Sequence, residues 1–292
     1  MRADTVNEPT PTSSSGGASP SSVEALFKMS VMLWTLGIDR PFNQRLEEVA
    51  EAGFRAVELA GEYRAWSEDD FRASNEKRRE LGITFDATAG AVVAPGRWRH
   101  NASDPRQREE FLADVRAELR FAEKLECPGL IVLGGELVPG LSPQAQYDSC
   151  VETLKRAAEL AENRGVMILL ENVDLEENPD YVARSVADTF QIVADVDHPQ
   201  VKVCYDLYHA QITGGNLIAN LERHIDQVGK IHIGDVPGHH EPGTGEINFA
   251  NIYIKLAELG YDGHVAMEFL PTGDPVETLA RAREAALLAA NS

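Results

Sequence analysis

Cysteine is scarce in this chain, and long apolar runs are missing. The 292 residues include three cysteines, Cys127, Cys150 and Cys204, and none of them forms a CxxC pair. An odd number of widely spaced cysteines argues against a disulfide framework and favours buried thiols in a reducing compartment. No apolar run approaches the ~18 residues of a membrane span. The sequence therefore predicts a cytoplasmic protein without a membrane partner.

Basic residues are also few. The chain has 27 Lys and Arg against 47 Asp and Glu, a formal net charge of -20. A protein that binds nucleic acid through phosphates carries a basic face, so this balance argues against a nucleic-acid partner. A GxGxxG turn is absent after the first predicted strand. Its absence argues against an open, doubly wound sheet built around a dinucleotide.

The first residues differ in composition from the rest. Residues 1–22 are rich in Ser, Thr, Pro and Gly and show no hydrophobic periodicity, so we expect a disordered leader. They contain no apolar h-region and are not an intact signal peptide, although the remainder of a cleaved export signal stays open. Residues 23–292 are expected to form one domain.

After the leader, eight strand patterns alternate with eight helix patterns. The predicted strands span residues 29–34, 56–59, 84–88, 130–133, 167–171, 201–205, 230–233 and 264–269. The predicted helices span residues 42–52, 68–81, 106–125, 144–164, 185–196, 217–224, 248–259 and 275–290. Such alternation gives parallel strands joined by right-handed crossovers. The predicted fold is an α/β protein, a single (β/α)8 TIM barrel of roughly 250 residues.

Acidic and imidazole side chains stand at the ends of the last four predicted strands. They are Glu171, Asp206, His232 and Glu268. Active sites of parallel barrels form at the C-terminal strand ends, and these strands are neighbours, so the four side chains can converge. Three carboxylates and one imidazole suit one divalent ion, Mn2+, Mg2+ or Co2+. A buried ion-pair network without a metal is the alternative.

Five further residues are candidates for contact with a small-molecule substrate. His209 stands three residues after Asp206, in a strand-to-helix loop, and Glu58 ends the second strand. His239 and His240 lie in the loop GDVPGHHEPGTGE, and Trp98 lies in the loop VVAPGRWRH. Each also has a structural alternative. His209 could be a surface histidine and Glu58 a buried hydrogen-bonding group. His239 and His240 could belong to a rigid turn that caps the barrel, and Trp98 could be a core residue.

The segments YDLYHAQ (205–211), KIHIGDVPGHHEPGTGEINF (230–249) and PGRW (95–98) resemble the xylose-isomerase-like barrel superfamily, and within it the hydroxypyruvate isomerase family. The resemblance covers nearly everything after the leader. It implies a metal-dependent isomerase that acts on a small α-hydroxycarbonyl compound through an enediolate, with hydroxypyruvate and tartronate semialdehyde as the pair. By resemblance, the metal ligands are Glu171, Asp206, His232 and Glu268. Both glutamates match the family's proton-moving pair, and His209 matches a substrate-binding histidine.

One position departs from the family pattern. His239 stands where such relatives have arginine in PGRHEPGTGE. Arginine offers a permanently charged fork to a carboxylate, whereas a neutral histidine holds a carboxylate less well but still bonds to a sugar hydroxyl. A larger neutral keto-sugar therefore stays open as substrate.

Other functions stay open on the same barrel. The site would also serve a ketose 3-epimerase, or an inosose or keto-sugar isomerase, dehydratase or lyase. A non-catalytic barrel that binds a sugar is a further alternative. AP endonucleases share the barrel, but they need a histidine-rich cluster of several metals, and the net charge of -20 would repel DNA. A homo-oligomer is compatible with the sequence.

Overall fold

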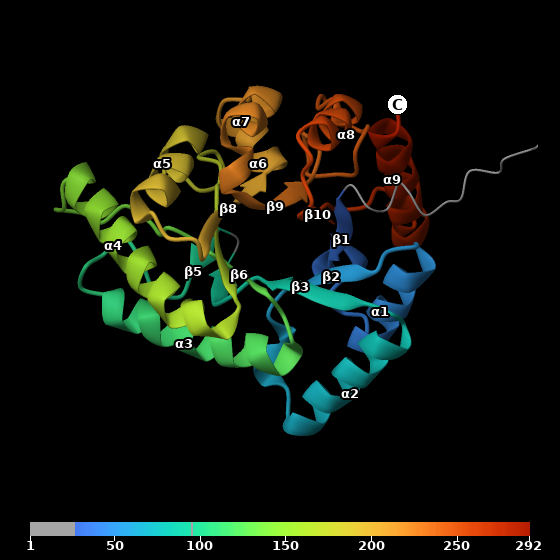
Figure 1. Cartoon of the computed structure of the whole chain (residues 1–292), viewed down its shortest axis with the longest axis horizontal. Coiled ribbons are helices and arrows are strands. Elements are labelled where there is room, and N and C mark those ends of the chain that lie inside the picture. The colour runs from blue at the N-terminus through green and yellow to red at the C-terminus, as the bar shows by residue number, and fades with distance from the viewer. Residues whose placement is uncertain (1–26, 95) are drawn as a thin grey trace, which may run out of the picture.

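Eight parallel strands close into a barrel, and helices surround it in chain order (Figure 1). The computed structural model describes residues 27–94 and 96–292, so the predicted leader, residues 1–22, lies outside the described part. Around the barrel the strands follow the order β1-β10-β9-β8-β7-β6-β3-β2. The predicted TIM barrel is confirmed.

The element bounds agree closely with the predicted pattern. The barrel strands are β1 (Lys28–Met32), β2 (Ala56–Leu59), β3 (Thr84–Thr88), β6 (Gly129–Val132), β7 (Met167–Glu171), β8 (Val201–Asp206), β9 (Val228–Ile233) and β10 (His264–Met267). The α-helices are α1 (Phe42–Glu51), α2 (Glu68–Glu80), α3 (Arg108–Leu125), α4 (Pro143–Ala161), α5 (Val186–Val196), α6 (Leu207–Thr213), α7 (Leu217–His224), α8 (Phe249–Glu258) and α9 (Pro275–Ala290). No helix in the described part of the chain combines the length and the apolar character that crossing a membrane requires.

Local sequence signals explain several helix starts. The hydroxyl of Ser67 accepts the backbone N–H of Asp70, and the Asp70 carboxylate accepts the N–H of Ser67, which is a capping box at α2. Ser142 caps α4 by accepting the N–H of Ala145, and Pro143 occupies the first helical position. Both caps satisfy backbone donors that a helix start leaves unpaired.

Side chains alternate between the barrel interior and the layer under the helices. On β9, Ile231 and Ile233 belong to the large core between barrel and helices, whereas His232 faces inward. On β8, Cys204 packs in the small interior cluster with Ala87, Ile131 and Leu169. This period-two pattern is what a strand in a closed barrel requires.

Three local features differ from the expected pattern. β1 ends at Met32 rather than at residue 34, because Leu33–Leu36 form a 3-10 turn, η2. His209 lies in a helix rather than in a loop: Asp206 ends β8, caps α6 and starts the helix without an intervening loop. The segment after β3 forms a hairpin of β4 (Val92–Ala94) and β5 (Arg97–Trp98).

Candidate active site

Glu171, Asp206, His232 and Glu268 lie together at one end of the barrel. Asp206 and His232 are register partners on the neighbouring strands β8 and β9. Glu268 follows β10, and its N–H donates to the carbonyl of Ile233 at 3.0 Å, which extends the β9–β10 pairing by one residue. The parallel strand order therefore brings together the four residues that the sequence singled out.

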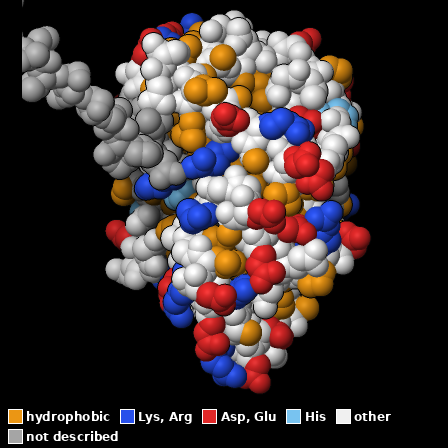
Figure 2. All heavy atoms as spheres, turned by 90° about the vertical axis from the view of Figure 1, so that its right-hand side faces the viewer, with side chains coloured by type: hydrophobic (Ala, Val, Ile, Leu, Met, Phe, Trp, Pro, Cys, Tyr) orange, Lys and Arg blue, Asp and Glu red, His pale blue; other side chains and the backbone are white. Residues whose placement is uncertain are grey.

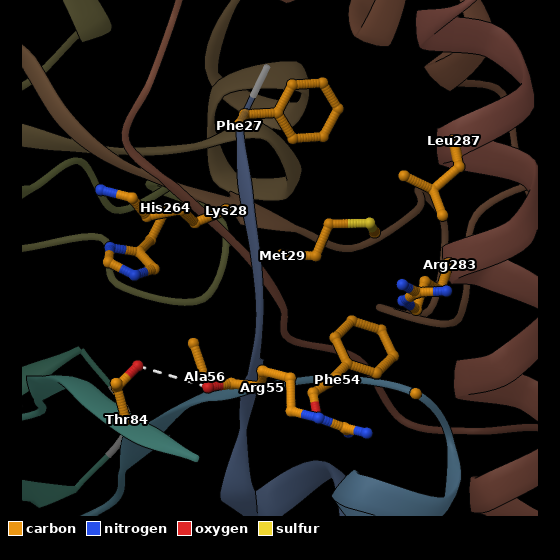
Figure 3. A pocket seen from close by; sticks show the side chains of 11 residues that line it. Phe27, Lys28, Met29, Phe54, Arg55, Ala56, Thr84, His264, Arg283 and Leu287 are labelled. Carbon is orange, nitrogen blue, oxygen red and sulfur yellow. Dashed lines mark hydrogen bonds between the residues drawn. The ribbon is translucent and has the colours of Figure 1, made fainter. Parts of the chain in front are cut away.

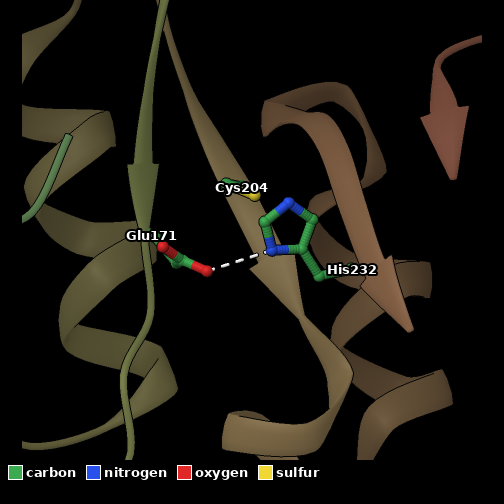
Figure 4. A group of neighbouring side chains, drawn as sticks. All are labelled: Glu171, Cys204 and His232. Carbon is green, nitrogen blue, oxygen red and sulfur yellow. Dashed lines mark hydrogen bonds and ion pairs between the residues drawn. The ribbon is translucent and has the colours of Figure 1, made fainter. Parts of the chain in front are cut away.

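Three carboxylates surround Nδ1 of His232. This atom lies 3.0 Å from Oε1 of Glu171 and 3.6 Å from Oδ2 of Asp206, and it also contacts Oε2 of Glu268. Figure 4 shows Glu171 and His232 pointing toward each other across the strand that carries Cys204. One ligand atom from each of the four side chains lies within 4.8 Å of the others, which is close enough to share one ion.

The four side chains differ in depth. Asp206 and His232 are each 1% exposed, whereas Glu171 and Glu268 are 14% and 12% exposed. The two glutamates therefore border the open end of the barrel, and the other two residues lie beneath them. A small molecule that enters the barrel mouth meets the glutamates first.

The crowded carboxylates have perturbed acidities. Burial raises the pKa of Glu171, although the contact with His232 works against this. Burial also disfavours ionised Glu268, but His232 holds the pKa of that carboxyl below its usual range. His232 is itself buried, which disfavours its charge, yet the surrounding acidic groups raise the pKa of His232 well above its ordinary value. The cluster therefore favours a positive charge at its centre.

The residues present fit one divalent ion. Oδ2 of Asp206 is buried and accepts no hydrogen bond from any residue that the structure describes. An unpaired buried carboxylate oxygen is costly, and a cation would satisfy it. Three carboxylates and one imidazole form a mostly hard, oxygen-rich donor set of the kind that Mg2+, Mn2+ or Co2+ accepts.

A second grouping combines Cys204 with Glu171 and His232. The Cys204 side chain packs in the apolar interior cluster of the barrel. Burial raises the pKa of Cys204 well above its usual range, and only the thiolate is a good metal ligand. The oxygen-rich group is therefore the better candidate.

His209 lies beside the four residues. Its backbone N–H donates to Oδ1 of Asp206 at 2.7 Å, and its Nδ1 lies 2.6 Å from Oδ2 of Asp174. Asp174 is held in turn by the N–H groups of Glu176 and Glu177, each at 2.8 Å. Burial disfavours a charged His209, but Asp206 and Asp174 raise the pKa of His209 to about 9. A cationic imidazole therefore stands next to the carboxylates at neutral pH.

Asp235 fixes the loop that follows β9, residues 236–247. Asp235 is 0% exposed, and its carboxylate accepts four backbone hydrogen bonds at 2.9 to 3.1 Å. The four donors are the N–H groups of Val236, Gly243, Gly245 and Ile247. Because the donors come from both ends of the loop, one carboxylate sets its shape.

The loop places His239 among aromatic rings. Its imidazole stacks face to face on Tyr208, with ring centroids 4.0 Å apart, and meets the ring of Trp34 edge-on at 5.8 Å. His239 has a φ of 56°, in the left-handed region. Nε2 of His239 is buried and has no hydrogen-bond partner in the described part of the chain. His240 instead donates from Nδ1 to the carbonyl of Leu270 at 2.7 Å, which ties the loop to the segment after β10.

Two of the expected substrate contacts need correction. Trp98 is 3% exposed and packs on Phe111 of α3, with ring centroids 4.7 Å apart, so hydrophobic packing covers it. Glu58 is 0% exposed inside the barrel, where its Oε2 lies 2.9 Å from Nε2 of His232. Both side chains are therefore buried rather than exposed to an entering substrate.

Three residues that the sequence analysis did not single out contact the candidate site. Trp34 donates from Nε1 to Oε1 of Glu268 at 3.1 Å, and Tyr208 stacks on His239. The Asn172 side chain accepts the N–H of Asp206 at 3.0 Å and donates to its carbonyl at 2.9 Å. Asn172 directly follows a predicted strand, and Trp34 ends one. Glu171 was selected because active sites of parallel barrels form at the C-terminal ends of strands, and the same reasoning could have selected Asn172 and Trp34.

Two hollows lie at the opposite end of the barrel. One, of about 190 Å³, is lined by the first residues of β1, β2, β3 and β10 and by Arg283 and Leu287 of α9 (Figure 3). The other, of about 370 Å³, is lined by the first residues of β6, β7, β9 and β10. Because the barrel strands are parallel, both hollows are remote from the carboxylates. In TIM barrels that end serves stability rather than chemistry.

The surface charges are mixed where Figure 2 shows them. On this face, the right-hand side of Figure 1, acidic and basic side chains alternate over the surface. Surfaces that bind phosphates usually carry a stripe or patch of basic side chains, and the basic side chains on this face form no such stripe.

Comparisons with known proteins agree with the fold. The family model of xylose isomerase-like TIM barrels matches residues 46–288. A 2-oxo-tetronate isomerase of Pectobacterium atrosepticum is 32% identical, over 84% of this chain and 93% of its own. The hydroxypyruvate isomerase of Escherichia coli is 29% identical, over 84% of this chain and 94% of its own.

Solved structures share the same barrel. A crystal structure named as an AP endonuclease of family 2, from Brucella melitensis, superposes with a TM-score of 0.78 at 27% identity, covering 88% of this chain and 98% of that one. A D-psicose 3-epimerase from Clostridium cellulolyticum superposes with a TM-score of 0.74 at 22% identity, covering 91% and 98%, which shows the shared fold alone. With the closed barrel and the family match over residues 46–288, these findings show that the chain is an isomerase of the xylose isomerase-like TIM barrel family.

Proposed function

We propose that the protein isomerises a small 2-oxo acid that carries a hydroxyl on the neighbouring carbon, such as hydroxypyruvate or 2-oxo-tetronate. The names of the relatives at about 30% identity support this substrate class. The reaction moves a proton between two adjacent carbons through an enediolate. It needs a group that stabilises the developing oxyanion and groups that move the proton.

One divalent ion is proposed to meet the first need. Glu171, Asp206, His232 and Glu268 would hold it, since their ligand atoms lie within 4.8 Å of one another. When bound, such an ion supplies Lewis-acid stabilisation of oxygen anions. Mn2+, Mg2+ and Co2+ all accept this donor set.

Glu171 and Glu268 are proposed to move the proton, and their exposure carries the proposal. They are 14% and 12% exposed, whereas Asp206 and His232 are each 1% exposed, so of these four side chains the two glutamates border the space open to a substrate. One glutamate would remove the proton from the carbon that bears the hydroxyl. The other would return one to the former carbonyl carbon, while the hydroxyl proton passes to the former carbonyl oxygen.

A neutral keto-sugar is the second candidate substrate, with ketose 3-epimerisation as its reaction. The surroundings of His239 favour it: the imidazole stacks on Tyr208 and meets Trp34. The loop of residues 236–247 contains no arginine that would grip a substrate carboxylate. Aromatic rings and an unpaired imidazole nitrogen suit the C–H faces and hydroxyls of a sugar.

A substrate panel in D2O tests the proposal. The protein is incubated with added Mn2+ and hydroxypyruvate, 2-oxo-tetronate, D-psicose or D-tagatose, and the products are followed by NMR. An isomerised keto acid that carries deuterium at the new C–H bond supports the leading proposal. Deuterium at C3 of a ketose, with inversion there, supports the second candidate. If none of the four substrates exchanges a proton for deuterium, both proposed reactions are contradicted and a non-catalytic binding role is left.

A further inference from the structure

We infer that Glu58 is a positioning residue for His232: from beneath, it holds the imidazole so that Nδ1 faces the three carboxylates, and it strengthens His232 as a metal ligand. The inference rests on the metal site proposed above. It assigns to Glu58 a role different from the substrate contact that the sequence suggested.

The geometry places Glu58 and the carboxylate cluster on opposite edges of one ring. Oε2 of Glu58 lies 2.9 Å from Nε2 of His232, while Nδ1 faces Glu171, Asp206 and Glu268. A carboxylate can only accept a hydrogen bond, so in the neutral imidazole that would hold an ion it favours the tautomer with the proton on Nε2. The lone pair of Nδ1 is then directed at the space among the three carboxylates. A carboxylate on the far nitrogen also makes an imidazole a more basic ligand.

Lys230 holds Glu58 in this position. Its Nζ lies 3.0 Å from Oε2 of Glu58 and 2.7 Å from Oδ2 of Asp86, and the side chain is 2% exposed. Two carboxylates thus share one ammonium group.

Stability alone does not explain this trio. Other interior positions of the barrel hold apolar side chains, including Ala87, Ile131 and Leu169. Buried ion pairs are often no more stable than apolar residues of the same volume, because each charge loses its hydration. In addition, Oε1 of Glu58 is buried and has no hydrogen-bond partner in the described part of the chain. Burying this carboxylate costs folding free energy. Its contact with Nε2 of His232 offers a reason for its presence, because it orients the imidazole.

Metal titration of the full-length protein tests the inference. Metal-free wild type and Glu58→Gln are titrated with Mn2+ by calorimetry, and Co2+ absorption spectra report the ligand geometry. Gln keeps the side-chain volume and removes the charge. We expect the Kd for Mn2+ to rise about 10- to 100-fold, with altered Co2+ bands, as for other groups that orient metal-binding histidines.

Glu118→Gln is the matched control. Glu118 is a 3% exposed glutamate that bonds to Tyr63 and Arg64 outside the barrel. The same change there should lower stability without altering the Kd or the Co2+ spectrum. A purely structural Glu58 would behave in the same way as this control.

The outcomes separate the inference from the function on which it rests. If wild type binds no Mn2+ or Co2+, the proposed metal site fails and the inference fails with it. If wild type binds and Glu58→Gln binds with the same Kd and spectrum, the inference alone is overturned. Should Glu58→Gln not fold, Glu58→Asp keeps the charge that Lys230 needs and draws the carboxylate away from Nε2. A wild-type Kd in that variant likewise overturns the inference.

Discussion

The indole N–H of Trp34 donates a hydrogen bond of 3.1 Å to Oε1 of Glu268. The two residues are far apart in sequence, and they meet because β1 pairs with β10 where the barrel closes. The bond leaves Oε2 as the oxygen of Glu268 that contacts Nδ1 of His232. Trp34 therefore determines which oxygen of Glu268 faces the centre of the site.

Replacing Trp34 with Phe removes this donor and keeps an aromatic ring. We expect kcat to fall about tenfold or more, because a hydrogen bond to a charged group contributes about 1.5–3 kcal/mol and about 1.4 kcal/mol corresponds to a factor of ten in rate. Steady-state kinetics on the substrate found in the panel measures the effect. Trp66→Phe is the control, since Trp66 packs on Phe42 and Phe71, away from the site. Wild-type kcat in Trp34→Phe would show that the bond does not orient Glu268 for the reaction.

His239→Arg tests whether His239 contacts the end of the substrate that lies remote from the carboxylates of the site. We expect the ratio of kcat/KM for hydroxypyruvate to that for a neutral ketose to rise about tenfold. Arginine adds one charge-assisted hydrogen bond to a carboxylate, worth about 1.5–3 kcal/mol, and offers nothing comparable to a hydroxyl. Kinetics on both substrates gives the ratio.

His240→Arg is the control for this experiment. His240 is the next residue in the chain, but it bonds to the carbonyl of Leu270 rather than stacking on Tyr208. The His240→Arg variant should leave the ratio of the two kcat/KM values unchanged. Equal ratios in wild type and His239→Arg would mean that His239 does not contact the substrate.

Asp235→Asn tests what holds the loop of residues 236–247. A carboxamide keeps one acceptor oxygen, so two of the four backbone N–H groups bound by Asp235 lose their partner. We expect unfolding free energy to fall by about 3 kcal/mol, with faster proteolysis within the loop and a higher KM. Urea unfolding, limited proteolysis and steady-state kinetics measure the three effects.

Asp274→Asn provides the comparison. Asp274 caps α9 by accepting the N–H of Glu277, and asparagine caps a helix about as well as aspartate. The free energy of unfolding of Asp274→Asn should therefore stay near that of wild type. An unchanged unfolding midpoint for Asp235→Asn as well would mean that the carboxylate does not fix the loop.

The convergence of Glu171, Asp206, His232 and Glu268 was predictable because it depends on strand order alone. Strands that alternate with helices are parallel and adjacent, so polar residues at consecutive strand ends meet at one end of the barrel. The period-two alternation of a strand likewise places Cys204 in the interior and Ile231 and Ile233 toward the helices, which is the packing that the structure shows.

Depth and local pairing were not predictable in the same way. Glu58 pairs with Met32 and Ala87, one residue before the end of β2, and the stagger of the strands puts it beneath His232. Trp98 is buried because β4 and β5 form a hairpin that turns its ring onto Phe111, a contact between distant segments. His239 meets Tyr208 because Asp235 shapes the intervening loop. No local sequence signal encodes these three-dimensional relations.

Proton exchange in Glu171→Gln and Glu268→Gln tests the central claim most directly. Both variants and wild type are incubated in D2O with Mn2+ and the substrate found in the panel, and deuterium incorporation is followed by NMR. Bound Mn2+ and thermal melting are measured in parallel, so that loss of metal or of fold is recognised. We expect each variant to fold and to lose exchange by about 100- to 10,000-fold, the range that a positioned acid or base contributes. If either variant with bound Mn2+ keeps more than about a tenth of the wild-type exchange, that glutamate does not move the proton.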